Sequence, residues 1–167
     1  MILFFSSLIL LFYIYLGYPC LIWAWSVLKQ RSIRKSPFLP SLSVLIIAHN
    51  EERHIARRIE NLIALDYPES LREIIIISDG STDKTVEYAR AFERKGIRVL
   101  EMSQRKGKAS CLNAAARECK GEVIVFGDAR QEFEKNVLKE LAANFSDPQI
   151  GVVSGELCFR DEEKTVV

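Results

Sequence analysis

The feature that most constrains this chain is an apolar run from Ile2 to Leu28 that contains no charged side chain. As a helix rising about 1.5 Å per residue, the run would reach roughly 40 Å, whereas the hydrocarbon core of a bilayer is about 30 Å thick. Trp23 and Trp25 suit the aromatic belt at a membrane surface. The run therefore predicts a transmembrane helix over residues 1–28, with a kink at Gly17-Tyr18-Pro19.

A cleaved signal peptide is the alternative reading of this run, but no basic residue precedes it and it is too long for a signal h-region. The basic residues Lys29, Arg31, Arg34 and Lys35 follow the run, and a basic cluster beside a membrane span stays on the cytoplasmic side. We expect residues 29–40 to be a basic juxtamembrane linker. The rest of the chain is expected to be cytoplasmic, anchored in the cell membrane (plasma or inner membrane).

Length and composition limit the remaining part of the chain to one domain. The chain has 167 residues, a net charge of +1 and 27% charged residues, which favours neither a nucleic-acid partner nor an acidic disordered protein. Its four cysteines form no C-x-x-C pair, so a zinc site is not expected. Cys111 and Cys119 fit buried free thiols.

Beyond Pro40 the hydrophobic period alternates between short β-rich runs and helical stripes. This alternation predicts βαβ units and a largely parallel sheet, that is, an α/β fold. The expected strands are residues 42–48, 73–78, 97–102, 122–127 and 150–155, and the expected helices are residues 52–65, 84–95, 108–119 and 135–145.

Polar residues follow each of the first four expected strands at its carboxyl end, where ligands bind in open parallel sheets. The segments are His49-Asn50-Glu51-Glu52, Ser78-Asp79-Gly80-Ser81-Thr82-Asp83, Arg105-Lys106-Gly107-Lys108 and Asp128-Ala129-Arg130. Because Asp79 and Asp128 end apolar strands, both carboxylates are expected to be desolvated, and a hydroxyl, cation or metal should satisfy them. The arrangement suits a ribose hydroxyl and a metal-bound pyrophosphate.

Each of these residues also has a purely structural interpretation. Asp79-Gly80 is a common turn dipeptide, and Asn50 is equally suited to cap the helix over residues 52–65. Lys108 fits a solvated loop charge, and His49 fits a packed or hydrogen-bonded side chain. Other nucleotide folds are excluded: the chain has no G-x-G-x-x-G, and Ala109 follows Gly107-Lys108 where a P-loop needs Ser or Thr.

Taken in order, these segments resemble the processive-type, membrane-bound family 2 glycosyltransferases, which have the GT-A fold. The stretch from Ser43 to Glu52 is similar to the family's opening strand and nucleotide-binding loop, with His49 where tyrosine is more usual. The resemblance implies that Asp79 contacts the uracil or ribose of a UDP-sugar and that Lys108 lies near the donor diphosphate. The implied donor-binding residues are Ala48, His49, Asn50, Glu51, Asp79, Gly80, Lys108 and Asp128.

The metal motif departs from the family pattern. The family commonly has Asp-x-Asp after the fourth strand, whereas this chain has Asp128-Ala129-Arg130, so only Asp128 is implied to bind a divalent cation, Mg²⁺ or Mn²⁺. Gln131 or Glu132 is a candidate to supplement it. The resemblance places the acceptor-side catalytic base beyond Glu156, so the domain over residues 41–167 is expected to continue past this chain.

The resemblance implies a glycosyltransferase that moves a sugar from a nucleotide-sugar, a UDP-sugar in the first instance, to a polysaccharide or a lipid-linked glycan. Membrane lipid is a further expected partner, and nucleic acid is not. One alternative is a nucleotide-sugar-binding module without turnover. Another is a membrane-tethered scaffold, which predicts no nucleotide binding at all.

Overall fold

The computed structural model describes residues 1–29 and 33–158, which form two separate compact units, Met1–Arg34 and Lys35–Val167. Each unit is described by itself. Arg31 of the expected basic linker lies outside the described residues.

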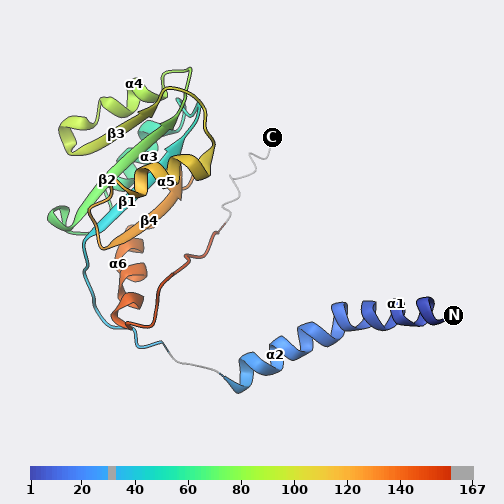
Figure 1. Cartoon of the computed structure of the whole chain (residues 1–167). Coiled ribbons are helices and arrows are strands. Elements are labelled where there is room, and N and C mark those ends of the chain that lie inside the picture. The colour runs from blue at the N-terminus through green and yellow to red at the C-terminus, as the bar shows by residue number, and fades with distance from the viewer. Residues whose placement is uncertain (30–32, 159–167) are drawn as a thin grey trace, which may run out of the picture. The chain divides into compact units, whose positions relative to one another are not determined.

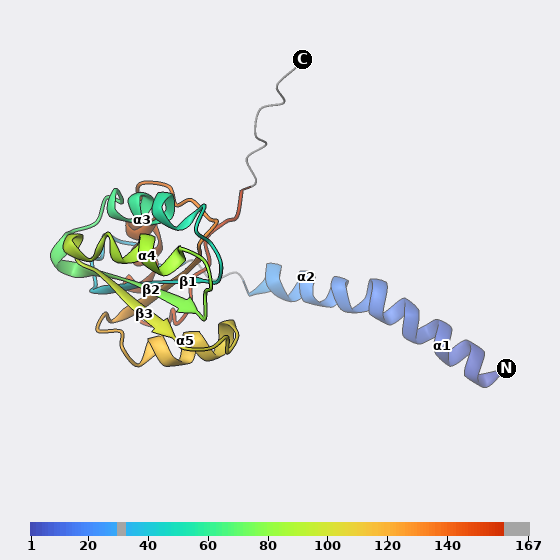
Figure 2. The ribbon, with the colours of Figure 1, turned by 90° about the horizontal axis from the view of Figure 1, so that it is seen from above.

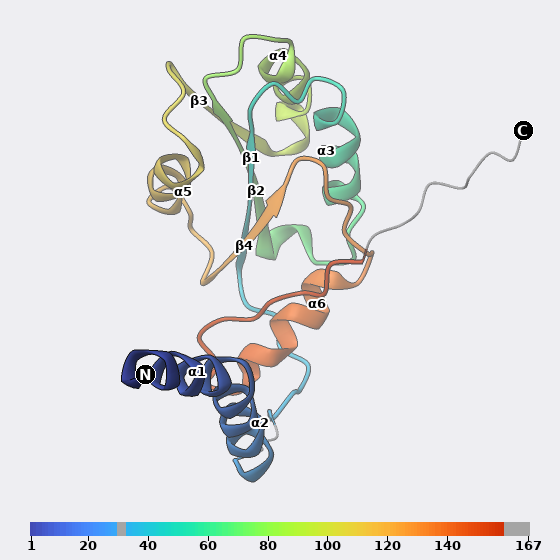
Figure 3. The same ribbon diagram turned by 90° about the vertical axis from the view of Figure 1, so that its right-hand side faces the viewer.

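The N-terminal unit is one helix in three segments: α1 (Ile2–Phe12), the π-helical turn η1 (Tyr13–Gly17) and α2 (Tyr18–Leu28). Its 27 residues have a mean hydropathy of 1.9 and are long and apolar enough to cross a membrane. The Ser6 and Ser7 hydroxyls donate to the Leu3 carbonyl at 3.0 and 2.8 Å, which satisfies them within the helix. The helix axis changes direction between α1 and α2, and the π-helical turn between these two segments, close to Pro19, accounts for this bend (Figure 3).

The second unit contains a four-stranded parallel sheet in the order β3-β2-β1-β4 (Figure 1). Its strands are β1 (Leu42–Ala48), β2 (Arg72–Asp79), β3 (Ile97–Met102) and β4 (Val123–Asp128). The predicted α/β fold with a largely parallel sheet is confirmed, and each of the first four expected strands is found within one residue of its predicted bounds.

Helices cover both faces of the sheet (Figures 2 and 3). Helices α3 (Ile55–Ile63), α4 (Thr85–Arg90) and α6 (Val137–Ala142) share one hydrophobic core with one face of the sheet, and α5 (Lys108–Ala116) packs on the other. Alternate residues of a strand enter opposite cores: Val44 and Ile46 enter the first, and Leu45 enters the second. Short 3₁₀ turns lie at Glu69–Leu71, Glu93–Lys95 and Ala143–Ser146.

One expected strand is absent from the described chain, and the four expected helices are each shorter than predicted. The segment over residues 150–155 forms no strand in the described chain, and Val152 is 88% exposed. A strand needs a hydrogen-bonded neighbour, and the described residues on the β4 side of the sheet provide none for it. The helix predicted from residue 52 begins at Ile55, because the residues before it form turns.

The strand order reverses at β1, which has β2 on one side and β4 on the other. In open α/β sheets, ligands bind beyond the carboxyl ends of the strands at such a switch point. In the register of the sheet, Ile47 of β1 is opposite Asp128 of β4. The fold therefore places His49 and Asp128 on either side of the position where a ligand is expected.

Candidate functional site

The loop after β1 is fixed to the loop after β2. His49 Nδ1 lies 2.7 Å from the Asp79 carbonyl oxygen, and because a carbonyl only accepts, this nitrogen carries the proton. Asn50 adopts a left-handed conformation with φ of 54°, and its Oδ1 accepts a hydrogen bond from the Thr82 amide at 2.9 Å. Asn50 is therefore not the N-cap of α3, which is His54; its side chain instead joins two loops of the rim.

Glu51 links the loop after β1 to the loop after β4. The Arg130 Nε donates to both carboxylate oxygens of Glu51, at 2.8 and 3.1 Å. The Glu51 amide donates to the Thr85 hydroxyl at 2.8 Å, so its backbone is held by the start of α4. The Glu51 side chain is largely covered, whereas Arg130 is 71% exposed. The pair therefore spans the switch point with its cation on the solvent side.

Asp79 is a buried carboxylate that accepts hydrogen bonds from the loop before α5. The Lys106 amide donates at 2.6 Å, and the Gly107 amide lies 3.2 and 3.0 Å from the two carboxylate oxygens. The Lys106 amide, with further hydrogen bonds from the Cys111 thiol and the Gly107 amide, lowers the pKa of Asp79 although burial opposes ionisation. Asp79 is thus an ionised carboxylate that holds a second loop by hydrogen bonds. A residue that served only the turn at Gly80 would not make these contacts.

Gly80 permits this loop to approach. Its φ is 61°, and an added Cβ would lie 2.5 Å from the Arg105 amide nitrogen. A side chain cannot fit at that separation, and the left-handed conformation favours glycine in any case. Gly80 therefore allows the backbone at residues 104–105 to pack against the end of β2.

Lys108 and Asp128 meet at the open side of the site. The Lys108 ammonium lies 2.6 Å from Asp128 Oδ1, and the two side chains are 61% and 53% exposed. The expected desolvation holds for Asp79, which is 4% exposed, and is wrong for Asp128. The reason is topological, because β4 has a neighbouring strand on one side only in the described chain.

Two neighbours of Asp128 were candidates to supplement it. Gln131 Oε1 accepts a hydrogen bond from the Asp128 amide at 3.0 Å, which keeps its side chain beside the end of β4. Glu132 instead pairs with Arg57 at 2.8 Å. Only the Gln131 side chain is thereby held against Asp128.

The donor set fits a divalent cation that is shared with a substrate. The described residues contain no group of three or more His, Cys, Asp or Glu that could hold a metal by themselves. Mg²⁺, however, usually binds through one or two carboxylates together with substrate phosphates and water. The exposed carboxylate of Asp128, which pairs with Lys108 at 2.6 Å, fits that role.

An open pocket unites most of the residues singled out in the sequence. Its lining includes His49, Glu51, Asp79, Lys108 and Asp128. Ala48, Asn50 and Gly80 are not among the lining residues and instead shape the loops around it, with Ala48 paired to Ser78 in the sheet. Arg105, which the sequence placed in the polar segment after the third strand but not among the donor-binding residues, also lines this pocket. The position of Arg105 in the basic loop after β3 could have identified it as a residue of the site.

Comparison with known proteins identifies the family. The model of Glycosyl transferase family 2 matches residues 43–166, which is most of the chain. The chain belongs to this family. The family 2 chain is 33% identical over 135 residues to the probable glycosyltransferase YdaM of Bacillus subtilis, covering 77% of this chain and 32% of YdaM. It is 35% identical over 130 residues to the beta-monoglucosyldiacylglycerol synthase of Nostoc, covering 74% and 27% of the two chains. It thus spans about a third of the length of these relatives.

Solved structures agree with this family and with the GT-A fold. The mannosyltransferase PcManGT from Pyrobaculum calidifontis, in complex with GDP-Man and Mn²⁺, superposes with a TM-score of 0.74 at 26% identity, covering 86% of this chain and 44% of that one. TarS from S. aureus in complex with UDP-GlcNAc gives a TM-score of 0.58 at 27% identity, covering 62% and 30%. The GT-A fold expected from the sequence is therefore confirmed.

Proposed function

We propose that this family 2 chain binds a nucleotide-sugar in the crevice between the ends of β1 and β4 and supplies the donor side of a glycosyl transfer. The observation that carries the proposal is the meeting of Lys108 and Asp128 at the topological switch point, with buried Asp79 in the same pocket. A cation, an exposed carboxylate and a buried carboxylate are the groups needed for a diphosphate, its counter-ion and a nucleoside.

Each residue has a role that follows from its position. Asp79, held ionised by loop amides, accepts a hydrogen bond from a nucleobase N–H or a ribose hydroxyl, for which the loop over residues 105–107 must yield part of its contact. Lys108 and Arg130 lie on the exposed side and face the negative charge of the diphosphate. Asp128 is the residue that would hold Mg²⁺ or Mn²⁺, which supplies further charge neutralisation at the diphosphate when bound.

The same arrangement favours the departure of the nucleoside diphosphate. During transfer the acceptor hydroxyl oxygen bonds to the anomeric carbon, the bond from that carbon to the phosphate oxygen breaks, and the acceptor proton passes to a base. Negative charge grows on the departing diphosphate, and fixed cations placed beside it lower the barrier. Lys108 is positioned for this task at the start of α5, where the helix N-terminus adds a favourable field.

The class of acceptor is proposed from the relatives. The Nostoc relative is named as a beta-monoglucosyldiacylglycerol synthase, and relatives in Staphylococcus are named as poly-beta-1,6-N-acetyl-D-glucosamine synthases at 28–29% identity. Their names support a lipid-linked or polysaccharide acceptor. The apolar N-terminal helix, which fits a membrane anchor, would keep this chain near a lipid-borne acceptor.

The test separates donor binding from transfer. The full chain in detergent micelles is titrated with UDP and, in a second arm, with GDP in the presence of Mn²⁺. Isotopically labelled nucleotide-sugars are then offered with membrane-lipid and oligosaccharide acceptors. We expect UDP to bind more tightly than GDP. Transfer to an acceptor would exclude the nucleotide-sugar-binding module, and failure to bind either nucleotide would refute the proposed function.

A further inference from the structure

Arg58 is a cation placed inside the hydrophobic core. It is 2% exposed and lies on the buried face of α3 with Ile55, Ile59 and Leu62, each of which is fully buried. Burial lowers the pKa of its guanidinium to about 10, and the charges of Asp128 and Glu132 oppose this shift, so the group remains cationic at neutral pH. Removing a guanidinium from water costs free energy, so the burial of Arg58 needs an explanation.

The hydrogen bonds of Arg58 are incomplete. One terminal nitrogen donates to Asn61 Oδ1 at 2.7 Å, and the guanidinium carbon lies 4.0 Å from the centre of the Phe133 ring. Its Nε and other terminal nitrogen are buried and find no hydrogen-bond partner in the described part of the chain. A buried guanidinium that is only half satisfied is unusual in a native core, and an apolar side chain of similar volume would pack there at lower cost.

Arg58 contacts both ends of the segment from Gly127 to Phe133, which carries Asp128. A Cβ added at Gly127, the residue before Asp128, would lie 2.7 Å from the unpaired terminal nitrogen of Arg58. At the other end, Asn61 accepts a hydrogen bond from the Phe133 amide and donates one to the Phe133 carbonyl, both at 2.9 Å. Arg58 and Asn61 therefore contact the segment from Gly127 to Phe133 at both of its ends.

We propose that Arg58 is a positioning residue of the donor site, which acts through Asp128: its buried positive charge, with Asn61, fixes the segment after β4 so that the Asp128 carboxylate is presented to a diphosphate. This inference rests on the proposed function. The guanidinium of Arg58 lies against Gly127, the residue before Asp128, and an apolar residue there could not supply the Coulomb attraction of a cation for Asp128. The Phe133 ring contacts the guanidinium by a cation–π interaction.

The test is a double-mutant cycle on UDP affinity in saturating Mn²⁺, measured by calorimetry on the full chain in micelles. The variants are Arg58→Met, Asp128→Asn and their combination. Arg90→Met is the control, since Arg90 is an exposed cation that pairs with Glu101 and neither residue lines the pocket. We expect Arg58→Met to weaken UDP binding about tenfold in the wild-type background, and to change it less than about twofold in the Asp128→Asn background. Arg58→Lys should recover part of the affinity, and Arg90→Met should leave it within about twofold of wild type.

The outcomes separate this inference from the proposed function. Equal losses from Arg58→Met in the wild-type and the Asp128→Asn backgrounds would show a merely structural role and overturn the inference alone. If wild type binds neither UDP nor GDP, both the proposed function and the inference fail. If Arg58→Met does not fold, as judged by circular dichroism, the same cycle is run with Arg58→Lys and with Phe133→Leu, which removes the ring beneath the guanidinium. Additive effects in those cycles would overturn the inference in the same way.

Discussion

The Lys108 ammonium lies 2.6 Å from Asp128 Oδ1, which joins the first residue of α5 to the last residue of β4 across the mouth of the pocket. Both side chains are more than half exposed, and exposed ion pairs contribute only about 0–1 kcal/mol to stability. The pair is therefore nearly irrelevant to folding. Substitutions here report on ligand binding with little interference from the stability of the domain.

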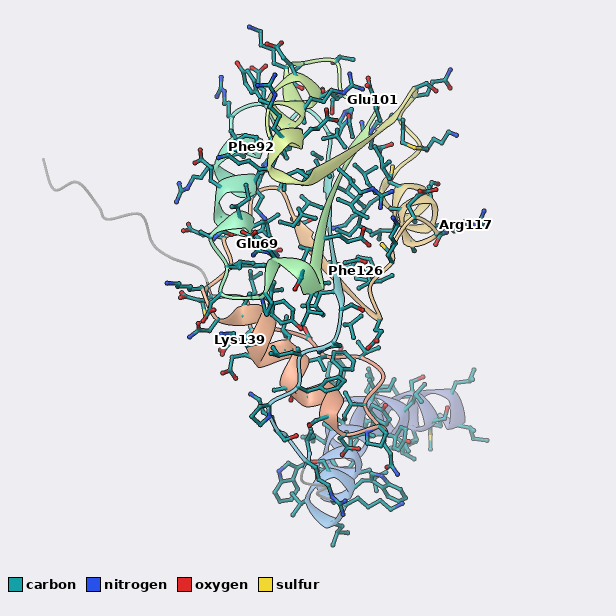
Figure 4. All side chains as sticks on the ribbon, turned by 90° about the vertical axis from the view of Figure 1, so that its left-hand side faces the viewer. Glu69, Phe92, Glu101, Arg117, Phe126 and Lys139 are labelled. Atoms are coloured by element: carbon teal, nitrogen blue, oxygen red, sulfur yellow. The ribbon has the colours of Figure 1, made fainter. Side chains whose placement is uncertain are left out.

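Lys108→Met is expected to weaken UDP binding about tenfold, because it removes a cation from the diphosphate position. Thermal unfolding followed by circular dichroism should change little. Lys139→Met is the matched control, since Lys139, which is labelled in Figure 4, forms a comparable exposed ion pair with Asp66 at 2.7 Å. Unchanged UDP affinity in Lys108→Met would remove Lys108 from the donor site.

Gly80→Ala is expected to destabilise the domain by more than the left-handed conformation alone costs, which is about 1–3 kcal/mol for a residue with a side chain. The additional cost comes from the contact of the new Cβ with the backbone of Gln104 and Arg105. Gly96→Ala is the control: Gly96 has a φ of 80°, but no described atom lies within 4 Å of its added Cβ. Chemical unfolding that gave the two variants the same loss would contradict the close approach at Gly80.

The sheet and the rim were predictable from sequence because their signals are local. The run Ile74–Ile77 is apolar on both faces, as a covered central strand requires, and the polar residues after each strand reach the same edge through the parallel topology. Residues 150–155 carry the same apolar signal but lack a neighbouring strand in the described chain. Whether a strand forms there depends on a partner, which periodicity does not report.

The cluster around Arg58 was missed for a different reason. Arg58 falls within the apolar stripe formed by Ile55, Ile59 and Leu62, and this position is the signal that was available. A helical pattern treats such an arginine as a surface residue that interrupts the stripe. Only the fold shows that Phe133 and Gly127, distant in sequence, close over it.

The stability contributed by Asp79 should depend on pH. Its folded-state pKa lies below the ordinary value of about 3.9, so the folded state holds fewer protons than the unfolded state, and the stabilisation is present above that value and lost as pH falls through the folded pKa. Asp79→Asn should therefore lower the thermal midpoint at pH 7. The difference in thermal midpoint between the variant and wild type should narrow as pH falls below about 4. A difference in thermal midpoint that stays constant down to about pH 2 would argue against an ionised Asp79.

The orientation of the anchor can be tested in intact cells. Lys29, Arg34 and Lys35 follow the apolar helix within the described residues, and positive charges beside a span are retained in the cytoplasm. A reporter fused after Val167 should resist external protease until the membrane is permeabilised. Moving the basic cluster to precede Ile2 should reverse this protection, and digestion of the wild-type fusion in intact cells would contradict a cytoplasmic domain.

Asp128 and Arg130 offer two routes to neutralise a diphosphate, and one pair of variants distinguishes them. If Asp128 holds a divalent cation, Asp128→Asn should weaken UDP binding by clearly more than the roughly 0–1 kcal/mol of an exposed charge pair in Mn²⁺, and by little in EDTA. If Arg130 neutralises the diphosphate instead, as a guanidinium can where the family commonly has a second carboxylate, Arg130→Ala should weaken binding equally with and without metal.

Arg130→Ala also releases Glu51, because Arg130 holds the Glu51 carboxylate at 2.8 Å. Arg130→Lys therefore serves as the control that keeps a cation beside Glu51. Calorimetric titration of the variants in Mn²⁺ and in EDTA decides between the routes, and equal UDP affinity for wild type and Asp128→Asn in saturating Mn²⁺ would exclude Asp128 as the metal ligand.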